Sequence, residues 1–98
     1  MSVYLVVDIT VHDPEQFAEY VKKAKPIVER HGGVYRIRGG DVTVREGDWN
    51  PQRLVAVEFP SRGHIDGCLA DPEYQPVMAI RHAAATSNMI MIDGHPPD

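Results

Sequence analysis

The alternation of apolar and other residues at the start of the chain is the feature that most constrains its fold. From Val3 to Val11 every odd position is apolar, whereas the even positions include Asp8 and Thr10. Successive side chains of a β-strand point to opposite faces, so this pattern predicts a strand with one face in a core. Its other face is mixed, and a sheet built on this strand therefore has one fully apolar side only.

A helix signal follows this strand directly. Asp13 is suited to the N-cap, Pro14 to the first helical position, and Gln16 completes a capping-box pattern. An apolar stripe at helical spacing continues to about His31, and Gly32-Gly33 provides the usual left-handed end. We expect a helix between these limits.

A double glycine, Gly39-Gly40, interrupts the next strand pattern. The apolar positions are odd before the glycines and even after them: Tyr35 and Ile37, then Val42 and Val44. Either a β-bulge or a two-residue hairpin turn would produce this change of phase. The next strand pattern, Arg53 to Phe59, must return antiparallel, and a bulge in one long strand needs no crossing connection. We therefore favour the bulge, with the hairpin as the alternative.

The rest of the chain completes a βαββαβ order. Ser61 is a plausible N-cap for a second helical segment, Asp71-Pro72-Glu73 starts a further helix, and Asn88 to Asp93 reads as a final strand. This order predicts an α+β, ferredoxin-like fold with an antiparallel sheet. We expect one domain over residues 1–94 and a tail over 95–98.

Helices cover only one face of such a sheet. The bare face would carry Tyr4, Val6, Leu54 and Ala56, which is too apolar a set to leave in water. A homodimer formed face to face would cover it and would give a dimeric α/β barrel.

Composition excludes several classes of function. The net charge is −4 and no concentrated basic patch exists, which argues against nucleic-acid binding. No apolar run approaches the roughly 20 residues that span a bilayer, and the first residues do not resemble a signal peptide, so we expect a cytoplasmic protein with no membrane role. Neither metal-ligand spacing nor a phosphate-binding glycine motif is present, so we expect no metal and no cofactor.

A longer motif points to a family. The run HGGVYRIRGGDVTVREGDWNPQRLVAVEFPS, followed by DPEYQ and by Arg81, resembles a bacterial family known as domain of unknown function thirteen-thirty. The resemblance extends from Val3 to Gly94. It implies a ferredoxin-like dimeric α/β barrel, and related barrel families include small monooxygenases, isomerases and cyclases that act on ring compounds, many without a cofactor.

Charged residues of the bare face are the first candidates for a site. Parity places Asp8, Arg36, Arg38 and Glu58 there, beside Tyr4. Arg38 could bind an anionic substrate while Glu58 or Asp8 moves a proton. The alternative is a salt-bridge network across the dimer, because charges buried there must be paired.

Four other residues complete the candidate set. Trp49 could cover a pocket or anchor its own loop. Tyr74 and Arg81 are two helical turns apart and could reach a cleft at the sheet rim as substrate-binding groups, or could be packed and solvated. His82 is a candidate general base or a surface histidine.

Two hypotheses for function follow. The first is a cofactor-independent enzyme that acts on a small anionic or ring-containing metabolite in a pocket near the sheet and helix rim. The alternative is a non-catalytic dimeric module that binds a metabolite or a protein partner. An enclosed cavity with an unmatched arginine would favour the first, and a solid interior with paired charges would favour the second.

Overall fold

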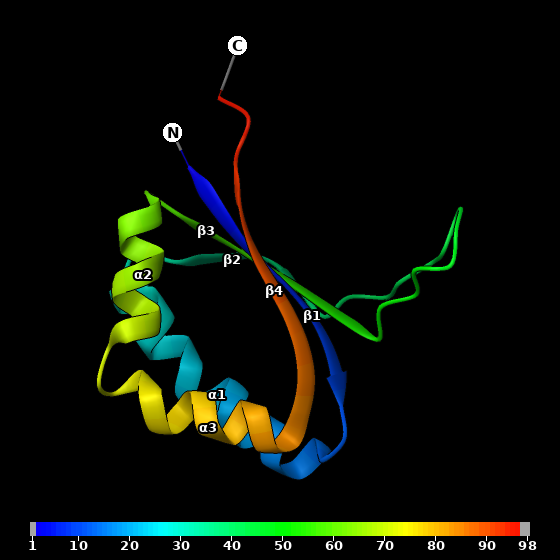
Figure 1. Ribbon diagram of the computed structural model, residues 1–98, viewed down its shortest axis with the longest axis horizontal. Helices are drawn as coiled ribbons and strands as arrows, with labels where there is room; N and C mark the ends of the chain where they lie inside the picture. The colour runs from blue at the N-terminus through cyan, green and yellow to red at the C-terminus, as the bar shows by residue number, and fades with distance from the viewer. Residues whose placement is uncertain (1, 97–98) are drawn as a thin grey trace.

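The chain folds into a four-stranded antiparallel sheet with three helices on one side (Figure 1). The computed structural model describes residues 2–96, so residue 1 of the predicted domain and residues 97–98 of the predicted tail lie outside it. The elements are β1 (Val3–Val11), α1 (Pro14–Arg30), β2 (Val34–Arg38), β3 (Arg53–Phe59), α2 (Arg62–Ala70), α3 (Tyr74–Ala84) and β4 (Ala85–Asp93). The strand order β2-β3-β1-β4 is ferredoxin-like, as predicted.

Local signals fix the helix ends. The Asp13 side chain accepts a hydrogen bond from the backbone N–H of Gln16, and the Ser61 hydroxyl accepts one from His64, so both predicted N-caps are confirmed. Gly32 has φ +87°, the left-handed conformation that was expected at the end of α1.

The core lies between the sheet and the helices. The odd residues of β1 from Val3 to Ile9 are buried there, together with Ile65 of α2 and Val77 of α3. Our prediction for the last strand was wrong at its start, because β4 begins at Ala85 and not at Asn88. Ala85 caps α3 through its backbone N–H and already pairs with Val11, so helix passes into strand without a loop.

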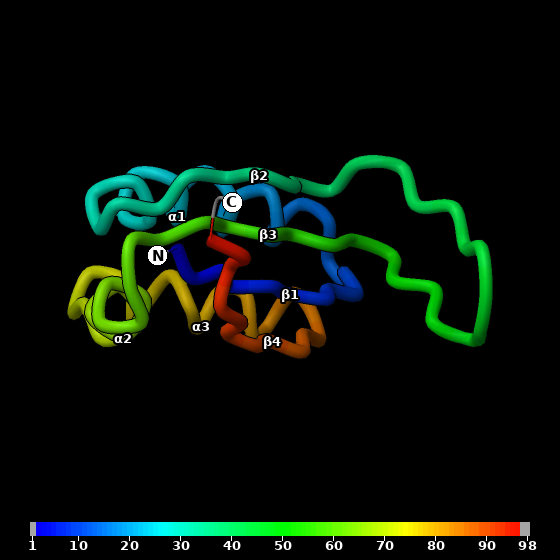
Figure 2. Tube along the Cα trace, turned by 90° about the horizontal axis from the view of Figure 1, so that it is seen from above, coloured from blue at the N-terminus to red at the C-terminus, as the bar shows by residue number. Residues whose placement is uncertain are grey.

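The predicted bulge is present in the strand, but not at the glycines. The pairing of β2 with β3 shifts between Tyr35 and Ile37, three residues before Gly39. After Gly39, whose N–H still donates to the Leu54 carbonyl, the chain leaves the sheet. Residues 39–52 then form a projecting arm without regular strand structure (Figure 2).

The predicted strand continuation through Val42 and Val44 is therefore wrong. Strand β3 begins only at Arg53, so the segment before it has no partner to pair with. The hairpin alternative is also wrong, since no two-residue turn joins two strands at the glycines. Among residues 2–96, none of the helices is long and apolar enough to cross a bilayer.

Candidate functional site

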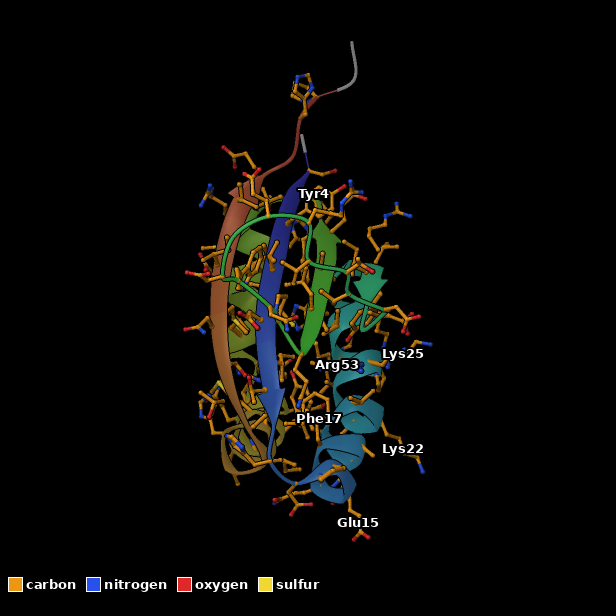
Figure 3. The ribbon with its side chains drawn as sticks, turned by 90° about the vertical axis from the view of Figure 1, so that its right-hand side faces the viewer. Tyr4, Glu15, Phe17, Lys22, Lys25 and Arg53 are labelled. Carbon is orange, nitrogen blue, oxygen red and sulfur yellow. The ribbon has the colours of Figure 1, made fainter. Side chains whose placement is uncertain are left out.

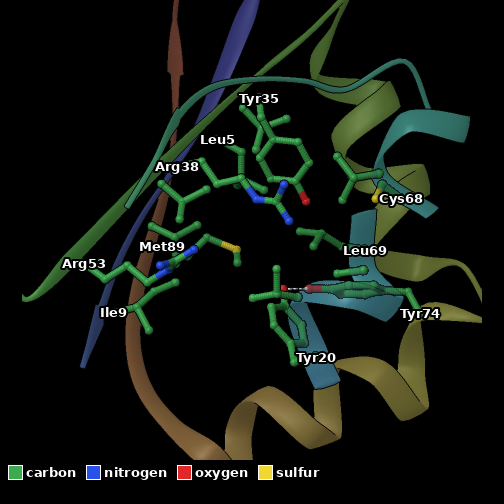
Figure 4. A pocket seen from close by; sticks show the side chains of 16 residues that line it. Leu5, Ile9, Tyr20, Tyr35, Arg38, Arg53, Cys68, Leu69, Tyr74 and Met89 are labelled. Carbon is green, nitrogen blue, oxygen red and sulfur yellow. Dashed lines mark hydrogen bonds between the residues drawn. The ribbon is translucent and has the colours of Figure 1, made fainter. Parts of the chain in front are cut away.

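A cavity lies between the covered face of the sheet and the helices (Figure 4). Most of its wall is apolar and comes from the sheet: Leu5, Val7, Ile9, Val55, Val57 and Met89. Its volume is ≈ 50 Å³, several times the roughly 10–15 Å³ that one water molecule needs. It is smaller than typical small-molecule sites, which span about 300–1,000 Å³, so a ligand would also occupy the open mouth of the cavity.

The bulge in β2 directs Arg38 into this cavity. Tyr35 lies opposite Val57 and Arg38 lies opposite Val55, so both side chains are on the covered face. In a regular strand two residues three apart would point to opposite faces. The extra residue reverses the phase, and the parity prediction that placed Arg38 on the bare face is therefore wrong. Arg38 stays solvent-exposed at the cavity mouth, with its guanidinium 4.7 Å from the centre of the Tyr35 ring.

A second arginine, Arg53, enters from the start of β3. Its guanidinium lies 5.4 Å from the centre of the Phe17 ring, and its Nε is buried with no hydrogen-bond partner among the described residues. The neighbouring Gly39 has φ +70°, and a Cβ there would lie 2.7 Å from Cζ of Arg53. A side chain at this position would force the guanidinium to move, and the positive φ there also favours glycine. Figure 3 shows Arg53 and Phe17 together at the end of the sheet where β3 begins.

Two tyrosine hydroxyls form a polar point on the helical side of the cavity. The hydroxyls of Tyr20 and Tyr74 are hydrogen-bonded at 2.9 Å (Figure 4). Arg81, only 5% exposed, lies with its guanidinium 5.7 Å from the centre of the Tyr20 ring, and its Nε has no partner within residues 2–96. Arg81 thus supports the tyrosine pair from behind and does not line the cavity itself.

The electrostatics of the cavity are one-sided. None of the described residues that line it is acidic, and neither Arg38 nor Arg53 forms an ion pair within residues 2–96. Burial raises the pKa of Tyr20, of Tyr35 and of the Cys68 thiol above their usual values. These groups therefore stay protonated at neutral pH. The cavity can bind negative charge and donate hydrogen bonds to it, but it holds no base.

The predicted proton-transfer residues lie elsewhere. On the bare face, Nε of Arg36 donates to Glu58 at 2.8 Å, and hydrogen bonds from Ser2 and then Arg36 hold the pKa of Glu58 below its usual value. Asp8, on the same face, accepts a hydrogen bond of 3.0 Å from the Trp49 indole. His82 is exposed on α3.

The structure thus brings together only part of the predicted set. Arg38 and Tyr74 line the cavity, whereas Trp49 is 63% exposed on the arm over the bare face. Within residues 2–96 no three His, Cys, Asp or Glu side chains gather as a metal ion would require. Arg53, Tyr20 and Tyr35 line the cavity but were not among the predicted site residues. Arg53 had a usable signal, because it shares the phase of Val55 and Val57.

Solved structures with the same fold include proteins of several descriptions. A protein of unknown function from Rhodopseudomonas palustris matches with a TM-score of 0.80 at 20% identity, over 98% of this chain and 84% of the other. SnoaB, a cofactor-independent oxygenase from Streptomyces nogalater, matches with a TM-score of 0.70 at 18% identity, over 98% and 95%. A dimeric ferredoxin-like protein of unknown function from Thermobifida fusca matches with a TM-score of 0.59 at 12% identity, over 94% and 90%.

At such identities the likeness concerns the fold alone. No curated protein matches the chain. The sequence profile of the family described as domain of unknown function DUF1330 matches residues 2–95, nearly the whole chain. The chain is therefore a member of the DUF1330 family.

Proposed function

We propose that this protein binds a small anionic, ring-containing metabolite in the cavity between sheet and helices and converts it without a cofactor. The observation that carries the proposal is an apolar cavity with two guanidiniums and no carboxylate on its described wall. Arg53 is partly buried and its Nε has no partner among the described residues, which is costly, so an anionic ligand would complement it. SnoaB, which shares the fold, is described as a cofactor-independent oxygenase.

The groups available suit a reaction in which negative charge develops on a substrate oxygen. Tyr35 is a protonated donor, and the hydrogen-bonded Tyr20–Tyr74 pair has one hydroxyl hydrogen left to donate. Donors aimed at a developing oxyanion lower the barrier to its formation. The proton acceptor would be the substrate or water, since the carboxylates of Asp8 and Glu58 lie on the other face. Their role as bases, and that of His82, stays a prediction.

The non-catalytic alternative is favoured by one observation. The described wall holds no carboxylate and no imidazole to act as a base, so binding without turnover needs nothing more than is present. Incubation of each identified ligand with the protein, followed by mass spectrometry, separates the two: a converted ligand supports the enzyme, and an unchanged one supports the binding module.

A homodimer is part of the proposal. The bare face exposes Val34, Ile37, Ile90 and Ile92, and a second copy applied to the same face would cover them. The Thermobifida fusca protein of this fold is described as dimeric. A cytoplasmic location rests on the sequence features alone and stays a prediction.

Replacement of one arginine tests the anion site against a matched control. In a thermal-shift screen of organic acids, ligands that bind the folded protein raise its melting temperature. For each ligand found, Arg38→Ala should cost about 1.5–3 kcal/mol of binding free energy, because a charged hydrogen-bond donor is lost. Arg36→Ala removes a charge two residues away that points to the other face, and should leave binding intact. Equal losses in both variants, measured by calorimetry, would contradict the proposal.

A further inference from the structure

The two arginines of the cavity differ in position, and this difference bears on the ligand. We infer that the ligand carries two separate acidic groups on a flat apolar frame, one bound by Arg38 and the other by Arg53. This inference rests on the proposed function, since it specifies the ligand of the same cavity. It extends that function from an anion to a diacid and assigns a binding role to Arg53.

The two arginines leave the sheet at separate backbone positions, and their guanidiniums lie over different rings. Arg38 lies opposite Val55, and Arg53 precedes Val55 by two residues on the same face. The Cα atoms of such diagonal neighbours are roughly 7–8 Å apart. Each guanidinium also stacks on its own ring, Arg38 on Tyr35 and Arg53 on Phe17. Figure 4 shows both side chains reaching toward the cavity from separate places on the sheet.

One carboxylate would leave half of this charge uncompensated. A guanidinium binds a carboxylate through two parallel hydrogen bonds, so a single carboxylate satisfies one arginine well. The other would remain a cation without a partner, and Nε of Arg53 is already buried without one among the described residues. A second acidic group, held at a distance by a rigid frame, satisfies both. The apolar wall of the cavity suits an aromatic ring as that frame.

Arg53 also connects the cavity to a neighbouring groove. It lines this groove together with Phe17, Val21 and Gln52, beside the first turns of α1. Gly39 has no side chain, so the Arg53 guanidinium can lie close to the Gly39 backbone. Arg53 is thus placed between the cavity and the groove. A ligand in the cavity can therefore place one acidic group at Arg38 and its second acidic group at Arg53, on the side of the groove.

Calorimetry with two matched probes tests the inference. Benzoate carries one carboxylate and isophthalate carries two on the same ring. We expect isophthalate to bind the wild-type protein at least about tenfold more tightly than benzoate, a difference of about 1.4 kcal/mol. Arg53→Gln should remove this advantage and leave benzoate binding in place, and Arg53→Lys, which keeps the charge, should restore part of it. Arg45→Ala, which removes a charge from the exposed arm, should leave the ratio unchanged.

The outcomes separate this inference from the proposed function. If benzoate binds in an Arg38-dependent way but isophthalate binds no better, or if Arg53→Gln keeps the advantage, the two-acid ligand is wrong and the anion site stands. If neither probe binds, or if Arg38→Ala changes nothing, both proposals are wrong. Circular dichroism checks that each variant folds, and Arg53→Lys alone decides the role of Arg53 if Arg53→Gln does not fold.

Discussion

Both faces of the sheet carry arginine side chains, but the surroundings of these arginines differ. On the bare face Arg36 is paired with Glu58, and Asp8 accepts a hydrogen bond from Trp49. On the covered face Arg38 and Arg53 have no acidic partner within residues 2–96. Paired charge on one face suggests a surface suited to contact with protein, whereas unpaired cations on the other suggest a site suited to a ligand.

This comparison also explains why the arginines of one short strand have different roles. Arg36 and Arg38 are two residues apart, and in a regular strand they would share a face. The bulge between Tyr35 and Ile37 separates them. Position relative to the bulge, and not residue type, therefore distinguishes the interface candidate from the binding candidate.

The largest effect should come from a charge placed on the bare face. Ile90 is 56% exposed in the single chain. In the proposed homodimer Ile90→Asp would bury a carboxylate without a partner, which costs several kcal/mol, so the dimer should dissociate while the subunit stays folded. Sedimentation measures this directly. Ala79→Asp on the exposed surface of α3 is the control and should stay dimeric. If Ile90→Asp also sediments like the wild type, the bare face is not the dimer interface.

A smaller effect is expected at the glycine that adjoins the cavity. Gly39→Val introduces a branched side chain at φ +70° and places its Cβ against the Arg53 guanidinium. A non-glycine residue in this conformation costs about 1–3 kcal/mol, which urea unfolding can measure. At Gly40 a Cβ would meet nothing within 4 Å and φ is not positive, so Gly40→Val serves as the control. An equal loss of unfolding free energy in both variants would show that any side chain at the start of the arm is destabilising, whether or not it contacts Arg53.

The smallest effect concerns a paired charge in the helical layer. Asp71 accepts hydrogen bonds from His31, Arg30 and the Glu73 N–H, which hold its pKa well below the usual range. A depressed pKa stabilises the fold above the unfolded value of about 3.9, and this contribution is lost as pH falls through the folded value. Asp71→Asn should therefore flatten the acid side of the melting temperature–pH curve.

The control for this measurement is Asp66→Asn, because Asp66 is exposed and is in no ion pair of residues 2–96. In Asp66→Asn the melting temperature should fall with decreasing pH as steeply as in the wild type. Exposed ion pairs contribute little to stability, so the change at Asp71 should be modest. An acid slope that is the same in Asp71→Asn and in the wild type would contradict the assignment.

Much of the fold could be predicted because its signals are local. The alternation of β1, the caps Asp13 and Ser61 and the left-handed Gly32 each depend on a few neighbouring residues. Which side chains face the cavity depends on the register between β2 and β3, which is not a local signal. The sequence predicted a phase change at Gly39-Gly40 with Tyr35 and Ile37 on one face, and this was wrong: the phase changes between Tyr35 and Ile37, because a bulge is set by pairing with β3 and not by the glycines that follow it.

The tyrosine pair illustrates the same limit. Tyr20 and Tyr74 are 54 residues apart on the apolar stripes of two helices, and only Tyr74 was a predicted site residue. Their contact follows from the packing of α1 against α3, which neither stripe specifies alone. Arg53 is the residue that could have been predicted. It shares the alternation of Val55 and Val57 in β3, which places its side chain on the face that the helices cover.

The extra residue in β2 sets the direction of Arg38. Without a bulge, regular pairing of the same residues after Tyr35 would place Arg38 opposite Leu54 on the bare face, whereas deletion of the extra residue would keep Arg38 opposite Val55 on the covered face. A change in the register of β2 would therefore move this positive charge between the pocket and the outer surface without any change of the arginine itself. Homologues with a β2 strand of the same length but no bulge should differ in the charge of the ligands they accept, even where they keep the same arginines.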